Sequence, residues 1–138
     1  MGRGMVATLA LTAVLLSAPA LAADAGSFDG NWNVLVLCPT TPEGLVGYTF
    51  QFSATVTAGA LHGQQGTAGQ PGSMSLDGTV APDGTAKLAA KGRTGQIAYT
   101  NVPSGSPYGY EVTAKFQGAR GSGSRVGAGR MCNYTFTR

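Results

Sequence analysis

Three kinds of side chain in this 138-residue sequence could do chemistry: one histidine, a few carboxylates and two cysteines. His62 is the sole imidazole, and a metal site built on imidazoles needs more than one. Asp77 and Asp83 each precede a glycine, which is typical of turns and does not favour a pair of carboxylates for general acid–base catalysis. The sequence contains neither a complete phosphate-binding loop nor a G-x-S-x-G nucleophile elbow. We therefore expect no catalytic residues, no metal and no cofactor.

Cys38 and Cys132 are the two cysteines. An even number of cysteines in an exported chain favours a disulfide, which here would join the first mature strand to the last. Because the closed loop is long, the bond would stabilise the fold by about 4–5 kcal/mol on the chain-entropy model. The alternative is a pair of buried free thiols.

The N-terminal segment has the composition of a secretory signal peptide. Arg3 precedes an uncharged, mostly apolar run over 5–18, and small residues at Ala20 and Ala22 predict cleavage before Ala23. We expect residues 1–22 to be the signal peptide, residues 23–138 to form one domain, and the product to be periplasmic or secreted. The alternative is an uncleaved anchor, although the apolar run is short for a membrane span.

The mature chain is weakly basic. Loss of Arg3 reduces nine Lys and Arg to eight, against six Asp and Glu, which leaves a net charge of +2. This charge does not predict nucleic-acid binding, which needs a dense basic patch. Basic side chains could still bind an anionic polymer or an envelope surface, the alternative being that they only keep a β protein soluble and protect its edges. These candidates are Lys87, Lys91, Arg93, Arg120 and Arg125.

Two stretches with a period of two must position whatever site the domain has. In the range 46–58, Tyr48, Phe50, Phe52 and further apolar residues alternate with polar ones, and the range 108–117 repeats this pattern. Alternation of this kind predicts strands with one buried and one wet face. We expect a ligand cavity, if the barrel is hollow, to lie between these two strands. The candidate interior residues are Trp32, Tyr48, Phe50, Phe52, Tyr110 and Phe116.

The rest of the mature chain predicts further strands and no helix. Strands are expected at 32–38, 73–76, 86–91, 93–100 and 132–136, with a tight turn at 58–59 and the strongest turn at 82–84. The range 118–129 is rich in glycine and predicts either a flexible hairpin or a short pair of strands with bends. Seven or eight strands with regular turns indicate a single all-β antiparallel meander, either a barrel or a sandwich.

Gly30, Asn31 and Trp32 open the first predicted strand. In this position they resemble the G-x-W motif of the lipocalin, avidin and bacterial metalloprotease-inhibitor barrels, which are eight-stranded up-and-down meanders. The resemblance implies that Trp32 closes one barrel end under a basic side chain, for which Arg130 and Arg138 are the candidates. Two departures stand out: the chain has only one tryptophan, and an inhibitory N-terminal arm would be limited to 23–27.

Most of the mature chain also resembles small exported bacterial proteins of unknown function. The shared pattern is an early Trp and Cys, a Pro-Asp-Gly turn, and a closing strand of the form Arg-x-Cys-x-Tyr-x-Phe, here residues 130–136. This resemblance supports the disulfide and implies no particular chemistry.

Together these observations predict a non-catalytic exported β domain that binds a small molecule or an envelope protein. A secreted or periplasmic protease inhibitor is the first alternative, and a structural, envelope-associated protein is the second. An enzyme is less favoured than either binding role. An outer-membrane barrel is disfavoured because the strands lack aromatic girdles.

Overall fold

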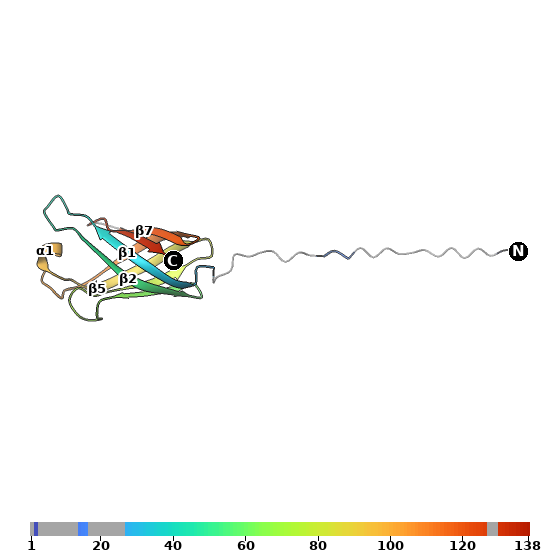
Figure 1. Ribbon diagram of the computed structural model, residues 1–138, viewed down its shortest axis with the longest axis horizontal. Coiled ribbons are helices and arrows are strands. Elements are labelled where there is room, and N and C mark those ends of the chain that lie inside the picture. The colour runs from blue at the N-terminus through green and yellow to red at the C-terminus, as the bar shows by residue number, and fades with distance from the viewer. Residues whose placement is uncertain (1, 3–13, 17–26, 127–129) are drawn as a thin grey trace.

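The computed structural model describes Gly2 and residues 14–16, 27–126 and 130–138. Eight antiparallel strands follow one another as a meander, and the first pairs with the last to close a barrel (Figure 1). The structure thus confirms the all-β meander and selects the barrel over the sandwich. The strands are β1 Gly30–Cys38, β2 Tyr48–Thr57, β3 Ala60–Gln65, β4 Met74–Val80, β5 Thr85–Arg93, β6 Pro107–Gln117, β7 Arg120–Val126 and β8 Asn133–Thr137.

The inward faces of the two long strands agree with the alternation in the sequence. On β2, Phe52, Ala54 and Val56 are buried, whereas the residues between them are exposed. On β6, Val112, Ala114 and Phe116 are buried in the same alternating way. A strand of a closed barrel has one face toward the core and one toward water, so the period of two in the sequence is sufficient to define both faces.

The disulfide between Cys38 and Cys132 is formed, as predicted. Both cysteines are buried, and they lie beside the ladder that pairs β1 with β8, in which Val36 is opposite Tyr134. The bond therefore fastens the chain at the seam where the barrel closes.

One end of the barrel is closed by tight turns, and we call it the closed end. Its connections are the turns at 58–59, 81–84 and 118–119. Ala58 and Gly59 both have positive φ, which suits a two-residue hairpin turn, and the Asp29 carboxylate accepts hydrogen bonds from both of their N–H groups at 2.7 and 3.1 Å. These short connections leave little room, and side chains fill the barrel beneath them.

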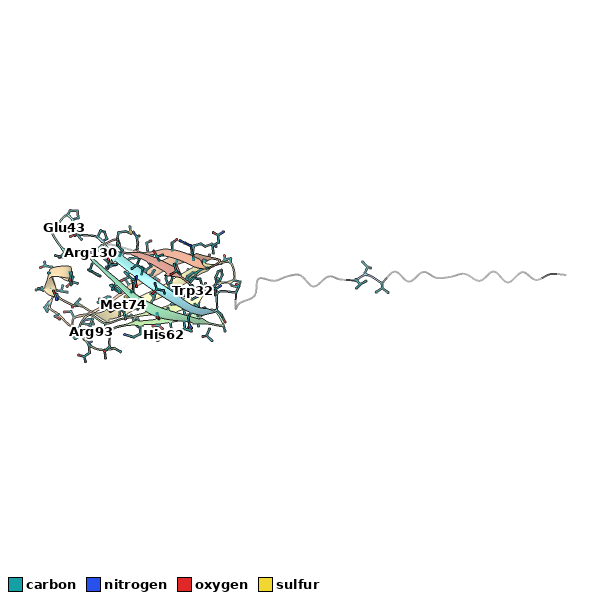
Figure 2. All side chains as sticks on the ribbon, viewed as in Figure 1. Trp32, Glu43, His62, Met74, Arg93 and Arg130 are labelled. Atoms are coloured by element: carbon teal, nitrogen blue, oxygen red, sulfur yellow. A yellow bond between two sulfur atoms is a disulfide. The ribbon has the colours of Figure 1, made fainter. Side chains whose placement is uncertain are left out.

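Trp32 forms the centre of that filling. Its ring packs edge-on against Phe116, with centroids 5.0 Å apart, and its Nε1 donates to the Phe28 carbonyl at 2.9 Å. The Arg138 guanidinium lies 4.5 Å from the centroid of the Trp32 ring and donates to the carbonyls of Asp29 and Ser27. Of the two arginines suggested by the G-x-W resemblance, Arg138 is thus the one that covers the tryptophan; Arg130 lies toward the other end (Figure 2).

The opposite end carries the long connections, and we call it the mouth. The connections at 39–47, 66–73 and 94–106 all lie there, and the last contains α1 Ile97–Thr100, a single helical turn (Figure 1). The buried Thr94 hydroxyl fixes this connection, because it donates to the Pro103 carbonyl at 2.7 Å and accepts from the Ser106 N–H at 3.0 Å.

The prediction of a strand over 93–100 was wrong. Arg93 is the last residue of β5, and it pairs directly with Pro107 at the start of β6. The ladder between β5 and β6 is therefore complete without this segment, which has no neighbouring strand to pair with. Its backbone groups are satisfied elsewhere instead: the Ala98 carbonyl accepts from the Val46 N–H at 3.1 Å, and the Ile97 carbonyl from the Asn101 N–H at 2.8 Å.

The glycine-rich range 118–129 also differs from both predicted forms. Its described part is a two-residue turn followed by β7, a regular strand that pairs with β6 and β8. Gly121 lies under an aromatic ring: a Cβ there would be 3.0 Å from the Phe116 ring. Gly63 on β3 likewise lies under the Phe52 ring, which would be 2.7 Å from a Cβ at Gly63. At these two positions, glycine makes room for a ring from the neighbouring strand.

The predicted signal peptide and its cleavage point lie almost entirely outside the described residues and stay predictions. In the described part of the chain, no helix has the length and apolar character needed to cross a membrane. The eight strands of the described part of the chain all lie between Gly30 and Thr137.

Candidate functional site

Two adjoining cavities of about 260 and 250 Å³ lie at the mouth of the barrel. Both are bounded by the two long strands, by the connection that contains α1 and by further residues of the mouth. The walls that they share are Tyr48, Thr94, Tyr99, Thr100 and Tyr108. The first cavity also reaches Phe50, Met74 and Arg93, and the second also reaches Tyr110, Arg125 and Arg130.

Aromatic rings line these cavities along β2 and β6. The rings of Tyr48 and Phe50 stack with centroids 5.9 Å apart, and Tyr108 stacks on Tyr110 at the same distance. All four point inward but are only half-buried, whereas inward residues deeper along both strands are buried. The barrel is therefore filled near the closed end and hollow at the mouth.

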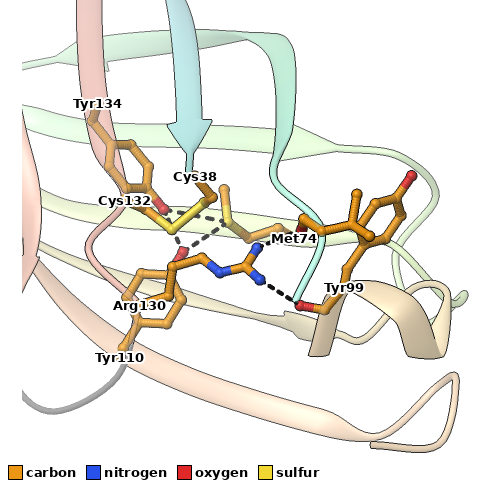
Figure 3. The surroundings of a disulfide bond; sticks show 8 residues. Cys38, Met74, Tyr99, Tyr110, Arg130, Cys132 and Tyr134 are labelled. Atoms are coloured by element: carbon orange, nitrogen blue, oxygen red, sulfur yellow. Dashed lines mark hydrogen bonds between the residues drawn. A yellow bond between two sulfur atoms is a disulfide. The ribbon is translucent and has the colours of Figure 1, made fainter. Parts of the chain in front are cut away.

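A polar cluster forms the floor of the mouth beside the disulfide (Figure 3). The hydroxyls of Tyr110 and Tyr134 are hydrogen-bonded at 2.6 Å, and both lie near the Met74 sulfur, at 3.9 and 3.7 Å. Burial raises the pKa of the Tyr110 phenol and, more strongly, that of Tyr134, where the neighbouring Tyr110 adds to the effect. Burial likewise raises the pKa of Tyr108. These phenols therefore stay neutral donors and acceptors at physiological pH.

Arg130 ties the parts of the mouth together. Its Nη2 donates to the Tyr99 carbonyl at 3.0 Å (Figure 3). Its Nη1 donates to the Val46 carbonyl at 3.0 Å, and its guanidinium lies 5.3 Å from the centroid of the Tyr48 ring. One side chain thus joins the connection before β2, the helix α1 and the first ring of β2. One of these charge-assisted hydrogen bonds goes to α1 and the other to the connection before β2, so Arg130 holds the two segments together.

Arg125 points into the mouth from β7. Its guanidinium lies 4.2 Å from the centroid of the Tyr110 ring, within the range of a cation–π interaction. Its Nε is buried and has no hydrogen-bond partner among the described residues. The contrast with Arg130 is clear, because Arg130 is satisfied by two carbonyls and Arg125 is not.

The charge of the cavity walls is of one sign. Arg93, Arg125 and Arg130 line the two cavities, and none of the residues that line them is an aspartate or glutamate. Arg93 donates from Nη1 to the Gly105 carbonyl at 3.0 Å. The arrangement gives the mouth a positive potential over an aromatic surface.

The rim of the mouth is apolar. Across 27–126 and 130–138, every large hydrophobic side chain that is strongly exposed lies at the mouth end, and Ile97 and Met131 are each 60% exposed. The complete set is Leu37, Val46, Ile97, Val102, Val126 and Met131.

The candidate interior residues divide between the two ends. Tyr48 and Phe50 line the cavities at the mouth, as does Tyr110, whereas Trp32 and Phe116 are buried in the filled end. Phe52 lies between the two groups and stacks on Phe50, with centroids 6.1 Å apart. Residues of both long strands line the cavities. Sequence reasoning did not select the wall residues Met74, Thr94, Tyr99 and Thr100 as site residues.

The candidates for an anionic surface do not form one patch. Lys87, Lys91 and Arg93 are exposed on the outer face of β5, and Arg93 in addition lines the first cavity. Arg120 is exposed at the closed end, where β7 begins. Arg125 does not share an outer face with any of them, because its side chain lies over Tyr110.

The polar residues considered for catalysis lie away from the mouth. His62 of β3 faces Asp77 of β4 on the exposed outer surface, where their side chains form a hydrogen-bonded pair. Asp83 lies in its predicted turn, where its carboxylate accepts a hydrogen bond from the Thr85 N–H at 2.9 Å. Hydrogen bonding from Thr85 lowers the pKa of the Asp83 carboxyl. The described residues contain no group of three or more potential metal ligands.

Compared with known proteins, the chain matches no family model, no curated protein and no solved structure. What the structure shares with the lipocalin, avidin and inhibitor barrels is the eight-stranded antiparallel closed barrel. The inhibitory arm of such a barrel would fall on residues 23–27, of which only Ser27 belongs to the described chain.

Proposed function

We propose that this domain is a non-catalytic, exported protein that binds a small molecule at the mouth of its barrel. The observation that carries the proposal is the change along β2 and β6 from buried side chains to half-buried aromatic rings that line a cavity. A concave, mostly apolar pocket with a few convergent polar groups is the usual form of a small-molecule site.

The chemistry of the walls supports binding without catalysis. The ionisable groups that line the cavities are arginines and tyrosines. Arginine keeps its proton at all physiological pH values, and burial moves the pKa of Tyr108 and Tyr110 further from neutrality. General acid–base catalysis needs a group whose pKa lies near the working pH.

The disulfide supports export. Cys38 and Cys132 are bonded, and disulfides persist mainly in oxidising compartments such as the periplasm and the extracellular space. Cleavage before Ala23 would release the barrel into such a compartment.

Binding of the neutral fluorescent probe phenylnaphthylamine tests this proposal. We expect its fluorescence to rise in the presence of folded protein, and the melting temperature to rise with probe concentration by mass action. Phe50→Asn should abolish the signal because Phe50 lines the cavity, whereas Gln51→Asn, one residue along on the outer face, should leave it unchanged. A folded wild-type protein that produces neither change would refute the proposal.

A second candidate function, docking of an envelope protein, is favoured by the apolar rim. Six large hydrophobic side chains at one end of a small barrel, with Ile97 and Met131 the most exposed, suit a protein interface better than a freely solvated surface. Ile97→Glu together with Met131→Glu should then abolish chemical cross-linking to the partner in exporting cells. Phenylnaphthylamine binding should remain. Unchanged cross-linking would exclude the rim as the interface.

A further inference from the structure

Arg125 is the one arginine of the mouth with a buried polar atom, its Nε, that has no hydrogen-bond partner among the described residues. Arg93 and Arg130 both donate to backbone carbonyls. The buried Nε of Arg125 has no acceptor among the described residues, and neither cavity has a carboxylate in its wall. A charged donor withdrawn from water without a partner is costly, and the Tyr110 ring beneath it offers only a partial compensation.

The position of Arg125 on β7 explains why its charge enters the barrel. Inward positions alternate along this strand, and Gly121 and Gly123 occupy the two that precede Arg125. Both glycines lie under side chains of β6: a Cβ at Gly123 would be 2.7 Å from the Ala114 Cβ. The first half of β7 therefore lies close against β6. The first long side chain that β7 points inward is that of Arg125, which reaches over the Tyr110 ring.

We propose that the ligand of the mouth is a planar organic acid. Its anionic group, a carboxylate or sulfonate, pairs with the Arg125 guanidinium, and its ring system lies against the aromatic walls formed by Tyr48, Phe50 and Tyr108. The inference rests on the proposed function and adds the chemical class of the ligand. A guanidinium presents a planar fork of donors that matches a carboxylate, so an oxyanion is the partner that best satisfies it.

The size and composition of the mouth suit such a ligand. The two cavities, about 260 and 250 Å³, share five wall residues and together fall within the range of small-molecule sites, roughly 300–1,000 Å³. Stacked ring pairs on β2 and on β6, with interplanar angles of 15° and 12°, present flat apolar surfaces on two sides. The neutral phenols of Tyr108 and Tyr110 add donors that do not repel an anion.

Two fluorescent probes that differ in one anionic group test this inference in the full mature protein. Anilinonaphthalene sulfonate carries the ring skeleton of phenylnaphthylamine together with a sulfonate. We expect the sulfonate probe to bind at least about 10-fold more tightly, and added salt to weaken this preference. Arg125→Gln should remove most of the preference by weakening the sulfonate probe alone, and Arg125→Lys should retain part of it. Arg120→Gln on the same strand, at the closed end, is the matched control and should change neither affinity.

Each outcome separates this inference from the proposed function. If neither probe binds the wild-type protein, both the proposed function and this inference fail. If both probes bind with equal affinity, or if Arg125→Gln weakens both equally, the mouth binds small molecules but Arg125 does not select anions. If Arg120→Gln has the same effect as Arg125→Gln, the preference comes from net charge and the inference is overturned. Should Arg125→Gln fail to fold, Arg125→Lys takes its place: a smaller preference for the sulfonate probe in this variant, with Arg120→Gln unchanged, supports the inference, and an unchanged preference overturns it.

Discussion

The contact between Phe52 and Gly63 allows a quantitative test of how the barrel is packed. A Cβ at Gly63 would lie 2.7 Å from the Cε2 atom of Phe52 and 3.1 Å from the Ala54 Cβ. Glycine is therefore required at this position because a ring from the neighbouring strand covers it. We predict that Phe52→Ala and Gly63→Val each destabilise the protein, and that the double variant loses less than the sum of the two.

The magnitudes follow from burial and distance. Phe52 is only 8% exposed, and removal of a buried phenylalanine ring costs about 3–5 kcal/mol. Gly63→Val overpacks the site and costs about 1–3 kcal/mol. In the double variant the closest clashing atom is absent and the valine fills part of the space left by the ring. We therefore expect the double variant to be about 1–3 kcal/mol more stable than the sum of the two single effects predicts. The remaining contact of the valine with Ala54 places the value toward the lower end of this range.

Urea unfolding of the four proteins, followed by circular dichroism, measures the coupling energy directly. Gln51→Ala, on the outer face beside Phe52, serves as the control and should change the free energy of unfolding by no more than about 0.5 kcal/mol. Additive effects would show that the ring and the glycine do not share the same space. A cost for Gln51→Ala as large as that for Phe52→Ala would mean that the inward face of β2 is wrongly assigned.

Three further predictions concern the seam, the closed end and the floor of the mouth. Replacement of Cys38 and Cys132 by alanine should lower the free energy of unfolding by about 4–5 kcal/mol in urea titrations, and an unchanged midpoint would contradict the chain-entropy estimate. Arg138→Ala should cost about 1–3 kcal/mol and shift Trp32 emission to the red, because the ring loses its cover; an unshifted spectrum would contradict this. Burial raises the pKa values of Tyr108, Tyr110 and Tyr134 above the ordinary value of about 10, so stability should be complete below pH 10 and fall as pH rises above it. In an alkaline titration, the tyrosinate absorbance of these three residues should appear only as the protein unfolds. If all tyrosines of the protein titrate while it is still folded, the three phenols are not buried as described.

The two long strands, β2 and β6, could be predicted from the sequence because each has one buried, apolar face and one exposed, polar face. Phe52 and Val112 alternate with polar neighbours, and a barrel wall requires this alternation. The turn at 82–84 was equally clear, since Gly84 has a positive φ of 90° and follows a proline and an aspartate. Local chemistry is sufficient at these positions.

The structure of the mouth could not be predicted in the same way, because contacts between residues far apart in the sequence determine it. The segment with Ile97 and Tyr99 alternates like a strand, but Val46 and Arg130, far away in the sequence, satisfy its carbonyls. On β7 the inward positions before Arg125 are glycines, which leave no apolar alternation to show which way the arginine points. Arg125 consequently looked like a surface charge.

Both described ends of the mature domain lie on one side of the molecule. The Arg138 N–H donates to the Ala119 carbonyl at 3.1 Å, and its Nη2 donates to the Ser27 carbonyl at 3.2 Å, which places Ser27 and Arg138 next to each other at the closed end. A linker, tag or solid support attached at either position would therefore hold the barrel with its mouth facing away from the attachment. Two copies joined in tandem would present two unobstructed openings, and the domain could be immobilised on a sensor surface without covering the cavity.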